Sequence, residues 1–490
     1  MKHANWIAGA QVPPRGGEYF PDANPARPDD VIGEFPRSDA EDVAAAVSAA
    51  EEGFAIWRRV PVPARGEILG RAGEILRERK EEIARLLSRE MGKTIREARG
   101  DVQEAVDTAF YAAGEGRRLF GRTTPSELPN KAAFTTRRPL GVCGLISPWN
   151  FPVAIPSWKA FPALLCGNSV VLKPASDAPA SAEAFVRILL EAGVEPRALN
   201  LVHGGGGQVG RALVAHPRVQ AISFTGSTEV GREIAEVAAR TLKRVSLELG
   251  GKNAVLIAPD ADADHALDGV TWGAFGSCGQ RCTTTSRLLL PESMHDRFVE
   301  RLCQRARALV AGDPLDERTD IGPLVNRAQL EQVARYVDIA RAEGAAIATG
   351  GKPNDALPGF FFHPTVVTGV TPDMRIAREE VFGPVLAVMR YRDLDQALAW
   401  VNATEYGLSS SIYTRDVSLA FRAIDEIEAG ITYVNGPTIG AECHLPFGGV
   451  RQTGNGHREG GWGPYDFYSE IKTVYVDYSG RLQRAQIDNR

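Results

Sequence analysis

The sequence predicts an α/β protein with two domains, each built on a parallel sheet, and a small projecting β element. Two regions, one from about residue 142 onward and one from 255 to about 434, alternate short apolar runs with helical patterns. This alternation is typical of parallel sheets that carry helices on both faces. Two further strand-like segments, 123–138 and 470–477, lie outside both regions and could pair as a ribbon with an exposed edge.

The N-terminal part of the chain should add helices around the first sheet. Residues 1–35 are rich in Pro and Gly and predict extended, turn-rich structure. A capping-box pattern, Ser38-Asp-Ala-Glu41, precedes apolar residues at helical spacing from 43 to 57. Further helical patterns run through 68–87 and 102–110. Each has one apolar stripe, so we expect these helices to pack on other elements.

Strands and helices then follow one another in both alternating regions. In the first, we expect strands at 142–147, 169–173, 199–203, 221–225 and 245–249, with a helix at 181–191. In the second, we expect strands at 254–258, 286–290, 385–391 and 430–434, with helices at 295–310 and 327–343. Ligands of such sheets bind beyond the carboxyl ends of the strands.

Composition excludes several classes of protein. The 490 residues are 44% hydrophobic and 24% charged, as in ordinary globular proteins of two or more domains. The net charge of -5 gives no basic surface for nucleic acid. The first twenty residues do not resemble a signal peptide, and no apolar run is long enough to span a bilayer. We therefore expect a soluble, cytoplasmic protein without a nucleic-acid or membrane partner.

Six cysteines in a long chain without export signals indicate reduced thiols rather than disulfides. Cys278 and Cys282 are four residues apart, and no Cys/His pair completes a zinc set, so we expect no metal. Cys282 ends the stretch Phe-Gly-Ser-Cys-Gly-Gln-Arg-Cys, whose glycines favour a tight buried turn. A thiolate there could attack a carbonyl carbon, although a buried structural cysteine is the alternative.

Two other polar residues follow predicted strands of the first region. Glu248 is the lone acid of an apolar strand before two glycines, where burial would make a carboxylate more basic. Asn150, in the stiff loop Ser-Pro-Trp-Asn-Phe-Pro, could donate to a developing oxyanion. The alternatives are a solvent-facing glutamate and an asparagine that bonds its own turn.

Glycine-rich turns at the same sheet edge suggest a phosphate site. The stretch from Phe224 to Gly231 follows a strand and opens a helix, whose N-terminus attracts anions. A glycine run at 204–207 follows the preceding strand, and Gly210 opens its helix. Lys173 ends another strand and could bond ribose hydroxyls. The stretch from Phe224 is a weak signal alone, because it is not a GxGxxG motif.

Together, seven motifs resemble those of the aldehyde dehydrogenase superfamily, in that family's order and over nearly the whole chain. They are Pro148-Trp-Asn-Phe-Pro, Lys173-Pro, Phe224-Thr-Gly-Ser-Thr, Glu248-Leu-Gly-Gly-Lys-Asn, Gly279-Gln-Arg-Cys, Glu380-Val-Phe-Gly-Pro and Pro446-Phe-Gly-Gly. The resemblance implies two Rossmann-like domains, with coenzyme bound by 1–121 and 140–250 and a catalytic domain at 251–451. It also implies an oligomerisation element at 122–139 and 468–490, and hence a homodimer or homotetramer.

The resemblance also implies the roles of residues. Cys282 would attack an aldehyde, Asn150 would hold the oxyanion, and Glu248 would activate the water that hydrolyses the thioester. NAD or NADP would contact Ile146, Ser147, Pro148, Trp149, Lys173, Ala175, Ser176, Gly206, Gly210, Phe224, Thr225, Gly226, Ser227, Leu249, Gly250, Glu380 and Phe382. Many NAD-preferring members carry glutamate where this chain has Ser176, so we expect NADP to be accepted as well.

The substrate is left open by the sequence. Phe151, Arg281, Thr283 and Phe447 are the candidate contacts. The default interpretation is a broad range of aldehydes. The loop Asn435-Gly-Pro-Thr438 is similar to that of dehydrogenases acting on 2-oxoglutarate semialdehyde, whose carboxylate Arg281 or Lys159 could bind. Alternatively, Arg281 points away and pairs with an acid. A CoA-acylating dehydrogenase and an inactive binding or structural protein are the remaining alternatives.

Overall fold

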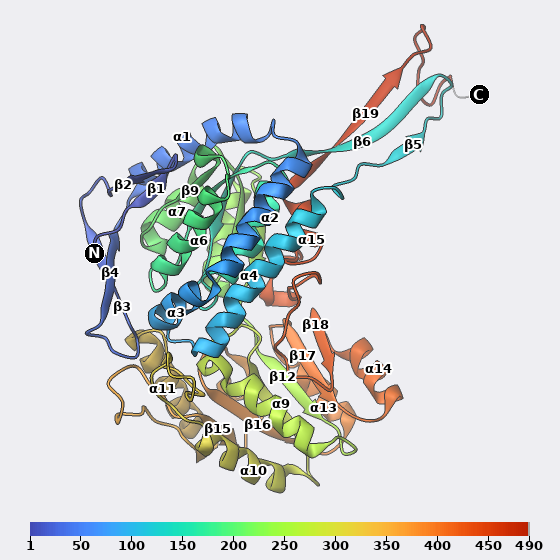
Figure 1. Cartoon of the computed structure of the whole chain (residues 1–490). Coiled ribbons are helices and arrows are strands. Elements are labelled where there is room, and N and C mark those ends of the chain that lie inside the picture. The colour runs from blue at the N-terminus through green and yellow to red at the C-terminus, as the bar shows by residue number, and fades with distance from the viewer. Residues whose placement is uncertain (489–490) are drawn as a thin grey trace.

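Two seven-stranded sheets form the two main parts of the protein, whose computed structural model describes residues 1–488 (Figure 1). The first sheet has the order β11 (Arg244–Glu248), β10 (Val219–Thr225), β7 (Val142–Ile146), β8 (Ser169–Lys173), β9 (Leu199–Leu201), β1 (Asn5–Ile7) and β2 (Ala10–Val12). The five strands from β11 to β9 in this order are parallel. β1 pairs antiparallel with β9, and β2 pairs antiparallel with β1. The predicted α/β class is confirmed.

Helices cover both faces of the first sheet. Val142, Ile222 and their neighbours face α1 (Ala40–Trp57), α7 (Arg211–Ala215) and α8 (Thr228–Ala239). Cys143, Ala221 and the alternate strand residues pack instead against the helices of the opposite face, because successive side chains of a strand point to opposite sides. Those helices are α2 (Val62–Glu78), α3 (Lys80–Met91), α4 (Ile95–Glu115), α5 (Ala154–Leu165) and α6 (Pro179–Glu191).

Two predictions for the N-terminal region need correction. The capping box is one residue later than expected, since Asp39 and Asp42 form it. The hydroxyl of Ser38 is unavailable because it bonds with Asn5. The helical pattern at 68–87 is two helices, since the backbone leaves helical geometry at Arg79 (ψ 15°). The extended segment at 1–35 is confirmed and includes the hairpin β3 (Tyr19–Ala23) and β4 (Val31–Pro36).

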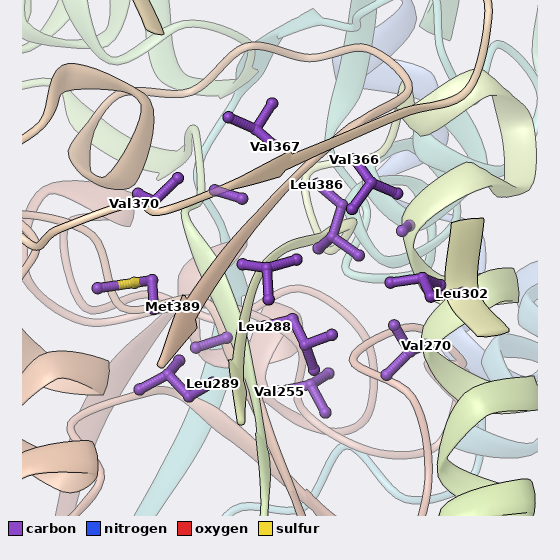
Figure 2. Close-up of a cluster of buried hydrophobic side chains, with 14 of the residues drawn as sticks. Val255, Val270, Leu288, Leu289, Leu302, Val366, Val367, Val370, Leu386 and Met389 are labelled. Atoms are coloured by element: carbon purple, nitrogen blue, oxygen red, sulfur yellow. The ribbon is translucent and has the colours of Figure 1, made fainter. Parts of the chain in front are cut away.

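The second sheet is parallel except at one edge. Its order is β14 (Ala346–Thr349), β15 (Thr365–Thr368), β16 (Val385–Tyr391), β13 (Thr285–Pro291), β12 (Asn253–Ile257), β17 (Ser409–Tyr413) and β18 (Ile431–Val434), and only β14 runs antiparallel to its neighbour. Around it lie α9 (Ala263–Phe275), α10 (His295–Ala308), α11 (Arg327–Ala342), α12 (Arg375–Arg378), α13 (Leu394–Asn402) and α14 (Val417–Glu426). Figure 2 shows its core, where Val255, Leu288 and Leu386 from adjacent strands lie near Leu302 of α10.

A three-stranded ribbon projects from the body of the protein (Figure 1). Its strands are β5 (Thr123–Pro125), β6 (Lys131–Pro139) and β19 (Ser469–Asp477), and the predicted pairing of the two segments is confirmed. The short helix α15 (Gly463–Phe467) precedes β19 and buries Tyr465 in the core of the first half. The segment predicted for this element extends to 490, and residues 489–490 lie outside the described residues. Over residues 1–488, none of the helices combines the length and the apolar character needed to cross a membrane.

Candidate active site

The carboxyl ends of four parallel strands bring the predicted residues of the first half to one edge. Ile146 pairs in register with Lys173 on one side and Phe224 on the other. Thr225 pairs with Glu248 on the neighbouring strand. Parallel register therefore places Ile146, Lys173, Thr225 and Glu248 at the same edge, as the strand–helix alternation predicts.

A cavity of about 650 Å³ opens beside this edge. Glu248 and Thr225 line it from the part of the protein built on the first sheet, here called the first half, and Cys282 lines it from the part built on the second sheet, the second half. Aromatic rings of Phe151, Trp158, Trp272 and Phe447 form much of the remaining wall. The candidate nucleophile and the candidate base thus share one mainly apolar tunnel.

The turn before Cys282 is tight and buried, as the glycines predict. Ser277 and Cys278 adopt the left-handed region, with φ of 50° and 56°, which costs free energy in non-glycine residues. A Cβ on Gly279 would lie 2.1 Å from the carbonyl oxygen of Gly383, so only glycine fits there. Packing of the chain on both sides must therefore hold the turn in place.

Side chains from distant segments clamp this turn. Glu97 of α4 accepts a hydrogen bond from the Ser277 N–H at 2.6 Å. Asn253 donates to the Cys282 carbonyl at 2.7 Å. The Asn150 amide donates to the carbonyl of Gln280 at 3.1 Å, and no bond from it to its own turn is present in the described chain. Asn150 therefore lies beside the loop of Cys282, with a second amide N–H to offer.

Cys282 is half-buried and packs against Trp158 and Phe447. Burial, followed by the charges of Glu380 and Glu248, raises the pKa of its thiol. The resting thiol is therefore protonated at neutral pH and must lose its proton before it can attack a carbonyl.

Glu248 is buried rather than solvent-facing, with 3% of its surface exposed. Neither carboxyl oxygen has a hydrogen-bond partner among residues 1–488. Burial, followed by the nearby charge of Glu459, raises the pKa of Glu248 well above its usual value. Buried polar groups are normally paired, so this carboxyl is available to a ligand or water.

Beneath Glu248 lies a buried ion pair between Lys159 and Glu459. The Lys159 ammonium also donates to the Ser223 hydroxyl at 2.9 Å. Its side chain is fully buried, and it does not line the tunnel. Lys159 is therefore not placed to bind a substrate carboxylate. Of the two cations that the sequence suggested for this role, only Arg281 remains a candidate.

Open backbone at the edge of the first sheet can hold a dinucleotide. A Cβ added to Gly206 or Gly210 would meet no atom within 4 Å, so both border open space. Gly226 and Ser227 lead into α8, and the Ser227 hydroxyl caps that helix. Open backbone beside a helix N-terminus is suited to a pyrophosphate.

Two buried hydroxyls in this region lack partners. Ser147, after β7, and Thr225, at the end of β10, have side-chain oxygens with no hydrogen-bond partner among the described residues. The half-buried Pro148 and Trp149 follow Ser147 in the same loop. These unpaired hydroxyls and the glycine-lined space fit a bound NAD or NADP.

Lys173 is buried, which excludes a solvated strand-end lysine. Burial lowers its pKa to about 8. Ala175 and Ser176 follow it and are half-buried, and the Ser176 hydroxyl donates to the Gly204 carbonyl at 3.3 Å. The position three residues after Lys173 thus carries a neutral hydroxyl and no charge.

Residues from the second half complete the coenzyme region. The Glu380 carboxylate accepts a hydrogen bond from the Gly251 N–H at 2.9 Å, and burial raises its pKa to about 7. A Cβ on Gly250 would lie 2.5 Å from that carboxylate. Phe382 meets Trp149 edge to face at 5.4 Å. Trp149 and Gly251 thus contact Phe382 and Glu380 of the second half. Leu249 lines the tunnel, and Phe224 is buried in the core of the first sheet.

All four candidate substrate contacts line the tunnel. The Arg281 guanidinium lies over the rings of Phe151 and Trp272, at 5.4 and 5.8 Å. It also pairs with Glu97 at 3.3 Å. Arg281 therefore faces the tunnel and has an acidic partner, a combination of the two predicted alternatives.

Sequence analysis missed the acidic face of α4, where Glu97, Asp101 and Glu104 line the tunnel. Their spacing of four and three residues was a usable signal, because it places them on one helix face. It also missed Glu459, whose distance of 300 residues from Lys159 hides the pair. Within residues 1–488, no group of three or more His, Cys, Asp or Glu could hold a metal, and all six cysteines are free.

Comparisons with known proteins place these observations in a family. Residues 12–474 match the model of the Aldehyde dehydrogenase family. The chain is 44% identical to the alpha-ketoglutarate semialdehyde dehydrogenase of Haloferax volcanii, over 97% of this chain and 99% of that protein. It is 41% identical to the alpha-ketoglutaric semialdehyde dehydrogenase of Bacillus subtilis, over 97% and 98%.

A solved structure shows the same fold. Betaine aldehyde dehydrogenase from Staphylococcus aureus, as a point mutant in complex with NAD+, superposes with a TM-score of 0.95. It is 32% identical, and the match covers 98% of each chain.

Proposed function

The chain belongs to the aldehyde dehydrogenase family, and from this premise we propose that it oxidises 2-oxoglutarate semialdehyde to the dicarboxylic acid with NAD or NADP. The enzyme is an NAD(P)-dependent aldehyde dehydrogenase, and the substrate is the step that we add. One observation supports that step most directly. Arg281 faces the tunnel that also holds Cys282, and it is placed to meet a negative charge at the far end of an aldehyde.

The first chemical step would use Cys282 and Asn150. The thiolate of Cys282 attacks the aldehyde carbon, and the carbonyl oxygen becomes an oxyanion. The free N–H of the Asn150 amide and the backbone N–H of Cys282 donate to that oxyanion. Support comes from the bond between Asn150 and the loop of Cys282. When bound, the nicotinamide coenzyme supplies the hydride acceptor, and Cys282 is left as a thioester.

Hydrolysis of the thioester would use Glu248. Glu248 lines the cavity in which a water molecule would approach Cys282, and its two oxygens have no partner among residues 1–488. A carboxylate of raised pKa takes a proton from water more readily than an ordinary one. Glu248 would therefore accept this proton as water attacks the thioester, which releases the acid and restores the thiol. A CoA-acylating enzyme would not need such a base.

The semialdehyde is favoured over a broad range of aldehydes for two reasons. Two relatives above 40% identity carry the name of a dehydrogenase for this substrate. The Arg281 guanidinium retains N–H donors beyond those that contact Glu97 and Ser277, and a carboxylate can take two such donors in a fork. The rings of Phe151 and Trp272 also lie close to the guanidinium.

A substrate panel tests the proposal. We expect kcat/KM for 2-oxoglutarate semialdehyde to exceed that for hexanal and benzaldehyde by roughly a hundredfold, since a charged hydrogen bond contributes ~1.5–3 kcal/mol. Succinic semialdehyde should be intermediate, because it has a carboxylate on a shorter chain. Equal or better activity on hexanal would leave a broad-range enzyme instead.

Domain roles and assembly belong to the proposal as well. The segments 1–121 and 140–250 would bind coenzyme, and 251–451 would carry catalysis. The ribbon of β5, β6 and β19 would join copies into a dimer or tetramer. Ile471 and Tyr475 of β19 are about two-thirds exposed, which is a cost that a second copy would remove. Light scattering after gel filtration would reveal a monomer if this is wrong.

A further inference from the structure

One face of α4 carries three acids into the tunnel. Glu97, Asp101 and Glu104 line the cavity together. Two of them have a cationic partner, since Glu97 pairs with Arg281 at 3.3 Å and Asp101 with Lys93 at 2.9 Å. Asp101 also accepts a hydrogen bond from the Ala154 N–H at 2.8 Å. The carboxylates of Glu97 and Asp101 are therefore already paired within the protein.

Glu104 is the third acid, and it differs from the other two. Its backbone carbonyl accepts a bond from Thr108, but its carboxyl has no hydrogen bond or ion pair within residues 1–488. Burial, followed by the charge of Asp101, raises its pKa to about 8. The carboxyl therefore carries its proton at pH 7 and faces the tunnel as a hydrogen-bond donor.

Several groups face Glu104 from the elements around it: Lys93, Asp101, Asp107, Arg281, Tyr433 and Cys443. Lys93 is ion-paired with Asp101 and Arg281 with Glu97, and burial lowers the pKa of Lys93. Burial raises the pKa of Tyr433, and burial followed by the charge of Asp107 raises that of Cys443 to about 11. Tyr433 and Cys443 therefore stay neutral at pH 8. Of the two groups in this set whose pKa values shift towards that pH, Glu104 lines the tunnel and Lys93 does not.

We propose that Glu104 sets which charge of aldehyde the tunnel accepts. With its proton, the carboxyl donates a hydrogen bond to the carboxylate of an anionic aldehyde, beside Arg281. Without its proton, it repels that carboxylate and attracts a cationic aldehyde. The anionic half of this inference rests on the proposed oxidation of a semialdehyde, and the cationic half does not.

The test compares three aldehydes of different charge at saturating coenzyme. We would measure kcat/KM from pH 6.5 to 9.5 for 2-oxoglutarate semialdehyde, betaine aldehyde and hexanal, which are anionic, cationic and neutral throughout. Dividing each value by that for hexanal cancels the ionisation of Cys282 and Glu248, because all three substrates need those groups. The anionic ratio should fall about tenfold or more between pH 7 and 9.5, with a midpoint near 8, since each pH unit beyond a pKa is a factor of ten. The cationic ratio should rise over the same interval.

Variants assign the effect to this side chain. Glu104→Gln keeps the shape and a donor but cannot ionise, so both ratios should become flat with pH. Asp107→Asn is the matched control, because it removes an exposed acid of the same helix that does not line the tunnel. Its ratios should still change with pH, with a midpoint somewhat lower than in the unaltered enzyme, because the charge of Asp107 raises the pKa of Glu104. Activity on hexanal reports whether each variant is folded.

The outcomes separate this inference from the proposed function. The role of Glu104 would be overturned by kcat/KM ratios that do not change with pH in the unaltered enzyme, or by a change with pH that persists in Glu104→Gln. If kcat/KM for hexanal instead exceeded that for the semialdehyde at every pH while the ratios still changed with pH, the proposed substrate would be wrong and the role of Glu104 would stand.

Discussion

Replacement of Arg281 by methionine gives the sharpest test of the substrate. Methionine keeps an unbranched chain that can lie between Phe151 and Trp272, but it removes the charge and every donor. If Arg281 binds the distal carboxylate, the loss should fall on anionic aldehydes alone. Hexanal has no group for the guanidinium to bind, so its kcat/KM should change by less than about threefold.

The magnitude follows from the bonds that would be lost. A hydrogen bond to a charged group contributes ~1.5–3 kcal/mol, and ~1.4 kcal/mol corresponds to a factor of ten. We therefore expect kcat/KM for 2-oxoglutarate semialdehyde to fall roughly ten- to a hundredfold. KM should rise and kcat should change little, because the carboxylate is bound alike before and during the reaction.

Glu97 complicates the simple variant, because Arg281→Met leaves its carboxylate without a cation. Glu97 still accepts bonds from the Ser277 N–H and the Thr94 hydroxyl, so its position should hold. The double variant Glu97→Gln/Arg281→Met removes both charges and separates substrate binding from this side effect.

The matched control is Arg305→Met. Arg305 also lines the tunnel and pairs with Asp268 at 3.0 Å, but it is largely exposed to solvent. Formation of NAD(P)H, followed by absorbance, gives the rates. An unchanged ratio of semialdehyde to hexanal in Arg281→Met, or an equal fall in Arg305→Met, would refute the assignment of Arg281.

Three further predictions concern the nucleophile, the base and the coenzyme. Cys282→Ala should abolish turnover but keep coenzyme binding, measured by fluorescence titration, whereas Cys278→Ala should be much milder; the reverse would exchange their roles. Glu248→Gln should still give a single-turnover burst of NAD(P)H with little steady-state rate, and a lost burst would show that Glu248 also activates the thiol. NADP should support activity within about tenfold of NAD, or ~1.4 kcal/mol, and Ser176→Glu should shift preference to NAD; an enzyme inert with NADP contradicts this.

The sequence predicts the edge of the first sheet well because the signals there are local. Short apolar runs end in Gly, Ser or Pro, and parallel strands necessarily present those ends together. Lys173 and Glu248 could therefore be assigned to one edge without knowing their contacts. Where the local signal is weak, a strand is not predicted. β17 was missed because its sequence begins Ser409-Ser-Ser, which lacks an apolar run.

Burial and pairing could not be predicted, because they depend on contacts between distant segments. A helical acid such as Glu104 usually lies on a solvated face, and only the packing of α4 beside the second half turns it towards the tunnel. Lys159 has the composition of a carboxylate binder, yet its partner Glu459 lies 300 residues away. The sequence offered two alternatives for Arg281, to face the tunnel or to pair with an acid. It gave no sign that the side chain does both, as it does in the structure.

The protonation states of the site suggest an order of events. Cys282 and Glu248 line the same cavity, and burial raises the pKa of both, which favours their protonated forms. Neither is then the reactive form, since attack needs a thiolate and hydrolysis needs a carboxylate. A bound oxidised coenzyme would supply a positive charge, and a positive charge near Cys282 would favour its thiolate. We therefore expect coenzyme to bind before the thiol is activated, and the same burial that delays activation protects Cys282 from oxidants until then.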